Sequence, residues 1–408
     1  MKEIILNNNL KLIYKHSESE LTSICISINA GAGIEEDKKG VAHVVEHMLY
    51  KGTQNRSEAQ INEELSNIFG FQNAMTNYPY VIYYGTLLNE DLEKGIELFA
   101  DILLNPEFDE CGFKEEMEVI KEELEEWDEE VEQFCEDKLF YNIYKKKRIK
   151  YPIIGTIESL NSIKVEDVCR FYKEKYFPEN TSISVISSIS FKETVNIIEK
   201  YFGKWQSKFK SRNFNHKVIK YEDINSSEVL FEKRHGVKNS RVQIIFPIDE
   251  LTHKELNAFR IFNQYFGEGV NSILYDTLRT KNSLVYDVIT RICHENYLKM
   301  YKITFTTSKE NVQRAIDLVM NLVKDICSND KFIDEIQLNK LIKSYKLKRL
   351  FREEQSIILA KELATYDTMF GDYNIYNDEF NKIDEVTVED ICRFPKKILK
   401  KFAIQVVY

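Results

Sequence analysis

The first part of the chain switches between strand-like and helix-like patterns of hydrophobic residues. Apolar and polar positions alternate in IILNN, LKLIYKH and SICISINA, which predicts three strands before the loop GAG. Helical spacing then predicts helices over 41–50 and 56–68. FQNAMTNY and YVIYYGTLL return to a strand pattern, and further helices are expected near 90–104 and 113–144. This mixture of elements predicts an α+β fold.

The same order of patterns recurs later in the chain. Strands are expected around 228–234, 241–247 and 284–306, with helices around 253–265 and 270–280 and long helices after them. The repeat is visible only as a pattern, without matching residues. We therefore expect two homologous domains, each with an antiparallel-rich sheet packed against helices.

A polar segment from Lys204 to Ser227 separates the two patterns. It is rich in Ser, Asn and Gln and lies near the middle of the 408-residue chain. We place a linker at 211–227, between a first domain at 1–210 and a second at 228–408. The length agrees with this division, because 408 residues are too many for one ordinary hydrophobic core and are typical of two domains.

Composition and charge exclude several classes of protein. Hydrophobic residues make up 43% and charged residues 30%, with both signs mixed, as in a globular protein. A net charge of −10 without a concentrated basic face opposes nucleic-acid binding. No apolar run reaches membrane-spanning length, so we expect no membrane insertion. Seven single cysteines without a CxxC pair or a signal-like leader favour reduced thiols and a cytoplasmic location.

The clearest chemical pattern is the segment GVAHVVEHMLY. His43 and His47 are four residues apart, so they share one helical face and can share a metal. Glu46 lies on the adjoining face, where it can reach a metal-bound water as a general base. By chance, HxxEH arises in roughly one to two per cent of sequences of this composition. A metal is favoured because uncompensated His and Glu would be costly among Val, Met and Leu.

Catalytic zinc takes three protein ligands and a water, so another ligand must come from elsewhere. The segment FKEEMEVIKEELEEWDEE offers glutamates, although such charge runs are usually solvated faces. At about 100° per residue its apolar side chains define one arc: Met117, Val119, Ile120, Leu124 and Trp127. Glu116 and Glu123 fall inside the arc, two turns apart, and therefore need partners. The remaining glutamates fall outside it or at its margin.

These residues resemble the pitrilysin and insulinase family of inverted-motif zinc peptidases, which includes mitochondrial processing peptidase. The block GVAHVVEHMLYKGT is similar to the family's motif from end to end. The family's spacing from the second histidine to its third ligand leads to Glu123, and a supporting glutamate two turns earlier corresponds to Glu116. The resemblance thus implies one Zn²⁺ per chain, held by His43, His47 and Glu123, with Glu116 supporting the site.

Two further segments resemble substrate-binding parts of the family. FQNAMT is similar to the edge strand that holds the substrate backbone, which implicates Asn73 and Ala74; a plain strand is the alternative. SILYDTLRTKNSLVY is similar to the signature of the family's inactive half, which implies that Arg279 and Tyr286 contact substrate and assist catalysis. Without the resemblance, a tyrosine in such an apolar stretch is usually a core residue.

The resemblance implies a zinc endopeptidase that cleaves unfolded peptides inside a clamshell chamber, of which this chain forms half. We expect a homodimer, because the chain has two of the family's four domains, although a heterodimer stays open. The alternative function is a non-catalytic or partner subunit of a processing peptidase or scaffold. The chain keeps both histidines, Glu46 and Glu123, which favours catalysis. Degradation, signal-peptide processing and peptide maturation all remain open as roles.

Overall fold

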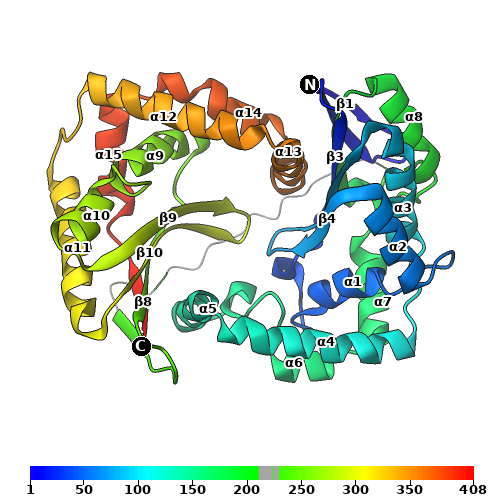
Figure 1. The fold of residues 1–408 in the computed structure, drawn as a ribbon, viewed down its shortest axis with the longest axis horizontal. Helices are drawn as coiled ribbons and strands as arrows, with labels where there is room; N and C mark the ends of the chain where they lie inside the picture. The colour runs from blue at the N-terminus through cyan, green and yellow to red at the C-terminus, as the bar shows by residue number, and fades with distance from the viewer. Residues whose placement is uncertain (211–223, 225–228) are drawn as a thin grey trace. The chain divides into compact units, whose positions relative to one another are not determined.

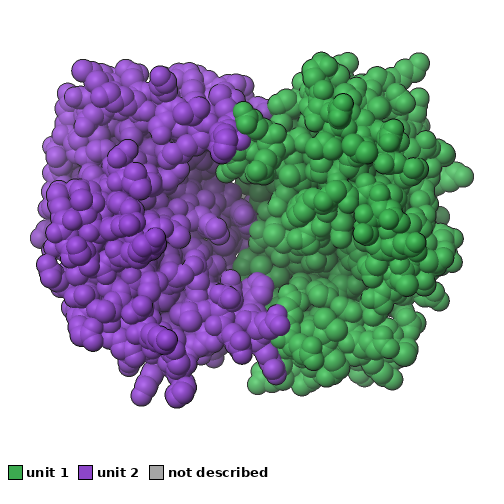
Figure 2. All heavy atoms as spheres, viewed as in Figure 1, with its two compact units in different colours: residues 1–124, 152–219, 352–376 green, residues 125–151, 220–351, 377–408 purple. Residues whose placement is uncertain are grey.

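The computed structural model describes residues 1–210, 224 and 229–408 and divides into two compact units, coloured separately in Figure 2. Unit 1 comprises residues 1–124, 152–219 and 352–376, and unit 2 comprises residues 125–151, 220–351 and 377–408. The predicted linker at 211–227 lies outside the described residues, apart from Ile224.

Unit 1 is built on a six-stranded sheet with the order β1-β2-β6-β3-β5-β4. β2 and β6 are parallel and all other neighbours are antiparallel. The strands predicted in the first 90 residues are confirmed. The strands are β1 (Lys2–Ile5), β2 (Lys11–His16), β3 (Leu21–Ile28), β4 (Phe69–Thr76), β5 (Val81–Leu88) and β6 (Thr181–Ser187).

Helices cover both faces of this sheet, which explains why the central strand β3 is buried along almost its whole length. Figure 1 shows α13 on one face, with α1, α3, α7 and α8 on the other. The helices of unit 1 are α1 (Val41–Leu49), α2 (Glu58–Ile68), α3 (Leu92–Leu104), α4 (Glu110–Glu129, as far as residue 124), α6 (Ile157–Ser162), α7 (Val165–Lys175), α8 (Phe191–Phe202) and α13 (Ser356–Phe370).

Helix α13 comes from the second half of the sequence but completes the core of unit 1. Leu359 and Leu363 belong to a buried cluster with residues of β2, β3, β5 and β6. Lys11 Nζ lies 2.7 Å from Asp367 Oδ1, and Ser182 Oγ donates a 2.5 Å hydrogen bond to Asp367 Oδ2. This buried polar cluster joins α13 to β2 and β6.

Unit 2 repeats the topology of unit 1. Its five-stranded sheet has the order β7-β11-β8-β10-β9, which matches β2-β6-β3-β5-β4 strand for strand. The pair β7 and β11 is parallel, as β2 and β6 are, and the other pairs are antiparallel. The predicted duplication is confirmed at the level of topology. The strands are β7 (Val229–Glu232), β8 (Ser240–Pro247), β9 (Val285–Glu295), β10 (Leu298–Thr307) and β11 (Ala403–Val407).

The helices of unit 2 also cover both faces of its sheet. α5 packs on β8 and β11, where Gln243 Nε2 donates to the carbonyl of Glu132 and Asn142 Nδ2 donates to Gln405 Oε1. The helices are α5 (Val131–Ile143), α9 (His253–Phe266), α10 (Ile273–Tyr275), α11 (Val312–Ser328), α12 (Glu335–Glu353), α14 (Asn374–Asn381, from residue 377) and α15 (Val388–Ile398).

Three of the sequence-based expectations differ from the structure. The helix predicted over 113–144 is divided between α4 and α5, because Glu130 has an extended backbone. The helix predicted over 270–280 is the short α10 followed by a π-helical turn, Asp276–Lys281. The compact units do not coincide with two contiguous halves, because residues 125–151 pack in unit 2 and residues 352–376 in unit 1. Each exchanged segment contributes a helix that packs on the sheet of its host unit, α5 on β8 and β11 and α13 on β3 and β6.

Candidate metal centre

Helix α1 carries the HxxEH motif and is fixed at its N-terminus by a buried carboxylate. Glu35 accepts 2.9 Å hydrogen bonds from the backbone N–H groups of Gly40 and Ala42. A negative charge at this end also suits the helix dipole. Gly40 has φ 92°, and a Cβ there would lie 2.4 Å from the carbonyl oxygen of Ile154. The start of the motif helix therefore requires glycine.

The two motif histidines and one glutamate of α4 converge on a single point. The rings of His43 and His47 are 4.4 Å apart between centroids. Glu123 Oε1 lies 3.7 Å from His43 Nε2, and Glu123 Oε2 lies 3.4 Å from His47 Nε2. One ligand atom from each residue lies within 4.8 Å of the others. Two imidazole nitrogens and a carboxylate are the donor set of many catalytic zinc sites, so these residues fit Zn²⁺.

Glu116 holds the second nitrogen of His47. Glu116 Oε1 lies 2.7 Å from His47 Nδ1, so Nε2 of the same ring faces Glu123. This arrangement of a carboxylate behind a histidine is typical of metal centres. The hydrogen bond to His47 lowers the pKa of Glu116. Burial lowers the pKa of His47, but hydrogen bonds to Glu116 and Glu123 outweigh burial and raise that pKa to about 9.

His43 lies in a different electrostatic environment. Burial, together with the neighbouring His47, lowers its pKa to about 4. Its Nδ1 is buried and has no hydrogen-bond partner within the described part of the chain. A neutral imidazole is the form that binds a metal, so this environment suits a ligand.

Glu46 lies on the same helix, beside the two histidines. Its side chain is buried, and Thr76 Oγ1 donates a 2.5 Å hydrogen bond to its Oε2. Burial raises the pKa of Glu46, and the bond from Thr76 opposes that effect. Sequence reasoning did not select Thr76. Although it closes the segment FQNAMT, its contact depends on how β4 packs against α1.

Strand β4 also carries Asn73 and Ala74, and it forms the edge of its sheet. One side of β4 pairs with β5, and no strand of the described residues pairs with the other. The side-chain oxygen of Asn73 accepts a 2.9 Å hydrogen bond from the N–H of Ala74. The strand that positions Thr76 beside Glu46 is therefore also a free edge.

Arg279 and Tyr286 lie close to each other in unit 2. Arg279 belongs to the π-helical turn and Tyr286 to β9, the edge strand of the second sheet. The guanidinium carbon of Arg279 lies 4.7 Å from the centre of the Tyr286 ring, and Arg279 also donates to the hydroxyl of Tyr275. Tyr286 is 83% exposed, so it is not the core residue that a plain apolar stretch would predict.

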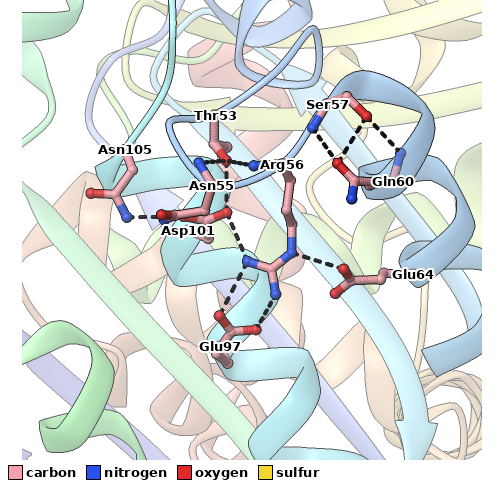
Figure 3. Close-up of polar contacts among 9 residues, drawn as sticks. All are labelled: Thr53, Asn55, Arg56, Ser57, Gln60, Glu64, Glu97, Asp101 and Asn105. Atoms are coloured by element: carbon pink, nitrogen blue, oxygen red, sulfur yellow. Dashed lines mark hydrogen bonds and ion pairs between the residues drawn. The ribbon is translucent and has the colours of Figure 1, made fainter.

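A polar cluster fixes the loop that follows α1 (Figure 3). Arg56 pairs with Glu64 at 2.9 Å, with Glu97 at 2.7 Å and with Asp101 at 2.8 Å. Thr53 Oγ1 donates a 2.7 Å hydrogen bond to Asp101 Oδ2. The cluster connects the loop to α2 and α3, so the chain leaving the motif helix is held in one position.

Two features lie outside the site, namely the apolar character of the helices and the state of the cysteines. Among the described residues, no helix combines the length and apolar character needed to cross a bilayer. All seven cysteines are free. The cytoplasmic location itself stays a prediction.

The sequence and the fold are both similar to known peptidases. A family model described as insulinase (peptidase family M16) matches residues 11–157, and one described as the peptidase M16 inactive domain matches residues 162–345. A Bacillus subtilis protein named as the uncharacterized zinc protease YmxG is 25% identical over 73% of this chain and 71% of its own length. The mitochondrial-processing peptidase subunit beta of Caenorhabditis elegans is 23% identical over 95% of this chain and 85% of its own.

A solved structure has the same fold as this chain. The crystal structure of a protease from Helicobacter pylori matches all of this chain and 98% of its own, with a TM-score of 0.87 and 19% identity. At this identity the likeness shows the fold, and the family models show the relationship. The two matching models together account for most of the chain. The chain belongs to the insulinase family, peptidase family M16.

Proposed function

We propose that this chain is a zinc endopeptidase in which Glu46 acts as the general base. The observation that carries the proposal is the convergence of His43, His47 and Glu123, because three protein ligands leave a coordination position open for water or substrate. Relatives named as zinc proteases support the same activity.

In the proposed reaction, His43, His47 and Glu123 would hold Zn²⁺, which would supply Lewis acidity toward the scissile carbonyl and a water molecule. Glu46 would accept a proton of that water while the water oxygen bonds to the scissile carbonyl carbon, and would pass the proton to the amine nitrogen as the C–N bond breaks. Thr76 occupies one oxygen of Glu46 and leaves the other available for the proton. Glu116 keeps His47 in the orientation in which Nε2 faces the metal.

The substrate that fits this site is an extended peptide. The free edge of β4 offers backbone groups to a peptide that adds to the sheet as a further strand. Ala74 and Asn73 would contact its backbone, and the Asn73 side chain would release the N–H of Ala74 to a substrate carbonyl. Pairing of this kind requires an extended segment whose backbone N–H and C=O groups are unpaired, which an unfolded peptide offers along its whole length.

For assembly, we propose a homodimer that encloses the substrate in a chamber, with each chain forming half of it. Arg279 and Tyr286 would then act on substrate bound at the metal centre, Tyr286 by donating to the developing oxyanion. A second candidate is one subunit of a hetero-oligomeric processing peptidase. The similarity to proteins named as subunit beta of mitochondrial-processing peptidase supports it.

Removal and return of the metal test the proposed function. We expect dialysis against a chelator to abolish cleavage of an unstructured peptide, and one equivalent of Zn²⁺ per chain to restore it. Mg²⁺ should not restore activity, because it prefers oxygen ligands in octahedral geometry. Full cleavage by protein shown to be free of metal would contradict the proposal.

A further inference from the structure

Lys51 continues the row of residues that carries the two motif histidines. His43, His47 and Lys51 follow one another at intervals of four residues. Although α1 ends at Leu49, the backbone keeps turning, because the N–H of Lys51 donates to the carbonyl of Met48 at 3.3 Å. Lys51 therefore lies on the same side of α1 as the two histidines, one turn further along.

The ammonium of Lys51 lies among carboxylates of two other helices. Its Nζ is 2.8 Å from Glu58 Oε2 in α2 and 3.6 Å from Glu115 Oε2 and Glu116 Oε2 in α4. The stem packs on the first turn of α4, where a Cβ added to Gly112 would lie 3.6 Å from Lys51 Cε. The Lys51 side chain is only 12% exposed, so this is not an ordinary surface ion pair.

Lys51 and His47 contact opposite oxygens of one carboxylate. Glu116 Oε1 lies 2.7 Å from His47 Nδ1, and Oε2 lies 3.6 Å from Lys51 Nζ. The Glu116 side chain is also 12% exposed. The positive charge beside Oε2 opposes rotation of the carboxylate away from the histidine and offsets part of its negative charge.

The loop beyond Lys51 is held independently of the metal centre. Asp101 on α3 accepts hydrogen bonds from Thr53 and Asn55 and pairs with Arg56, as Figure 3 shows. The backbone entering Lys51 is fixed by α1 and the backbone leaving it by this cluster. The backbone on both sides of Lys51 is therefore fixed, which keeps the Lys51 side chain next to Glu116.

From these contacts we propose that Lys51 is a positioning residue of the metal centre: its ammonium holds and charge-balances Glu116, which in turn orients His47 as a ligand. The inference rests on the proposed function, because it requires that His47 bind Zn²⁺. It assigns to Lys51 an effect on metal affinity that a simple tether between α1, α2 and α4 would not have.

The test measures zinc affinity of the full-length protein by competition with a chromophoric chelator. We expect Lys51→Met to weaken zinc binding about 10-fold, the lower end of the range for outer partners of metal ligands. Lys51→Arg should restore affinity close to that of the wild type. Glu116→Gln should weaken binding at least as much as Lys51→Met, and the double variant should be no weaker than Glu116→Gln alone. Additive losses in the double variant would contradict action through Glu116.

Glu115→Gln and Glu58→Gln are the matched controls. Glu115 lies as far from Lys51 Nζ as Glu116 does, but it is 65% exposed and is not a predicted partner of His47. Glu58 is the nearest partner of Lys51 and belongs to α2. Neither variant should change zinc affinity. If Glu58→Gln reproduces the loss, Lys51 acts as a tether between helices and the proposal is wrong.

Melting of the metal-free protein separates affinity from folding. A Lys51→Met chain that melts earlier than the wild type but binds zinc equally well would overturn the proposal. If Lys51→Met does not fold, the same comparison is made with Lys51→Gln. A wild-type chain that binds no zinc would contradict the proposed function itself, whereas equal binding by wild type and variant contradicts only the role of Lys51.

Discussion

Two glutamates of α4 reach the motif histidines in different ways. Glu123 faces Nε2 of both rings, whereas Glu116 contacts only Nδ1 of His47. The two positions are seven residues apart, so they lie on one face of the helix, separated by about two turns. The same face therefore presents the proposed third ligand, Glu123, and a hydrogen-bond acceptor, Glu116, to His47.

At the residue scale, the role of Glu46 can be separated from metal binding. We expect Glu46→Gln to retain zinc but to lower kcat/KM for an unfolded peptide by roughly 100- to 10,000-fold, the range for a positioned acid–base group. The change keeps the shape of the side chain, so Thr76 and α1 should stay in place. Zinc content and peptide cleavage are measured on the same preparation.

The control for this variant is Glu122→Gln, next to Glu123 but on the exposed side of α4. It should cleave the peptide at the wild-type rate. A Glu46→Gln protein that also cleaves at that rate would remove Glu46 from the reaction.

Sequence analysis selects residues by their spacing along a helix, which a single sequence reveals. Helical spacing puts His43 and His47 on one face, and the apolar arc of α4 encloses Glu116 and Glu123. The buried face of α4 is narrower than the apolar arc predicts, because Val119 is 49% exposed. Periodicity does not indicate Thr76 or Lys51. Their contacts depend on how β4, α2 and α4 pack around α1, and the hydrophobic pattern does not specify that packing.

At the scale of elements, the sequence predicts which segments are helices better than it predicts where they pack. The repeat of strands and helices is visible in the hydrophobic pattern, and the structure confirms it. α5 and α13 nevertheless pack in the unit opposite to that expected from their place in the chain. An apolar face shows that a helix needs a partner, but not which of two similar sheets provides it. β11 was also missed, because five buried residues at the end of the chain carry little pattern.

The docking of α13 provides an element-scale prediction. Asp367→Asn should lower the free energy of unfolding of unit 1 by about 3 kcal/mol, because it leaves Lys11 buried without its main partner. Lys11→Met combined with Asp367→Leu should recover much of the loss, because apolar residues can replace a buried pair. Urea unfolding monitored in unit 1 measures both.

The exposed pair of Lys200 and Glu93 serves as the comparison, and Glu93→Gln should change stability little. If Asp367→Asn behaves like this surface variant, the buried pair does not hold α13 on the sheet.

At the scale of the whole molecule, the duplicated topology gives two units with different chemistry. Unit 1 carries the proposed metal ligands, and the matching helix of unit 2, α9, has no HxxEH motif. Unit 2 instead presents Arg279 and the exposed Tyr286 beside a free sheet edge. This division suggests that one repeat performs the chemistry and the other contacts substrate, and we propose that the two act together in a dimer.

Mixing two inactive variants tests the dimer. If Tyr286 acts on the site of the partner chain, Glu46→Gln and Tyr286→Phe proteins should regain activity when mixed. Half of randomly formed dimers are mixed and half of their sites are intact, so recovery should approach about a quarter of wild-type activity. Peptide cleavage after confirmed subunit exchange measures the recovery.

The matched control mixes Glu46→Gln with Glu123→Gln. Both changes lie in the same centre, so every site keeps one defect and no activity should return. Recovery in neither mixture would place Tyr286 within its own chain's site or outside the reaction, and an active monomer in solution would contradict the dimer.

The most direct test of the central claim is X-ray diffraction from zinc-loaded crystals, recorded on both sides of the zinc absorption edge. We expect one anomalous peak per chain, bonded to Nε2 of His43, Nε2 of His47 and a carboxylate oxygen of Glu123 at about 2.0–2.2 Å, with Glu116 on Nδ1 of His47. A zinc peak bonded to other residues, or none at these three in protein saturated with the metal, would contradict it.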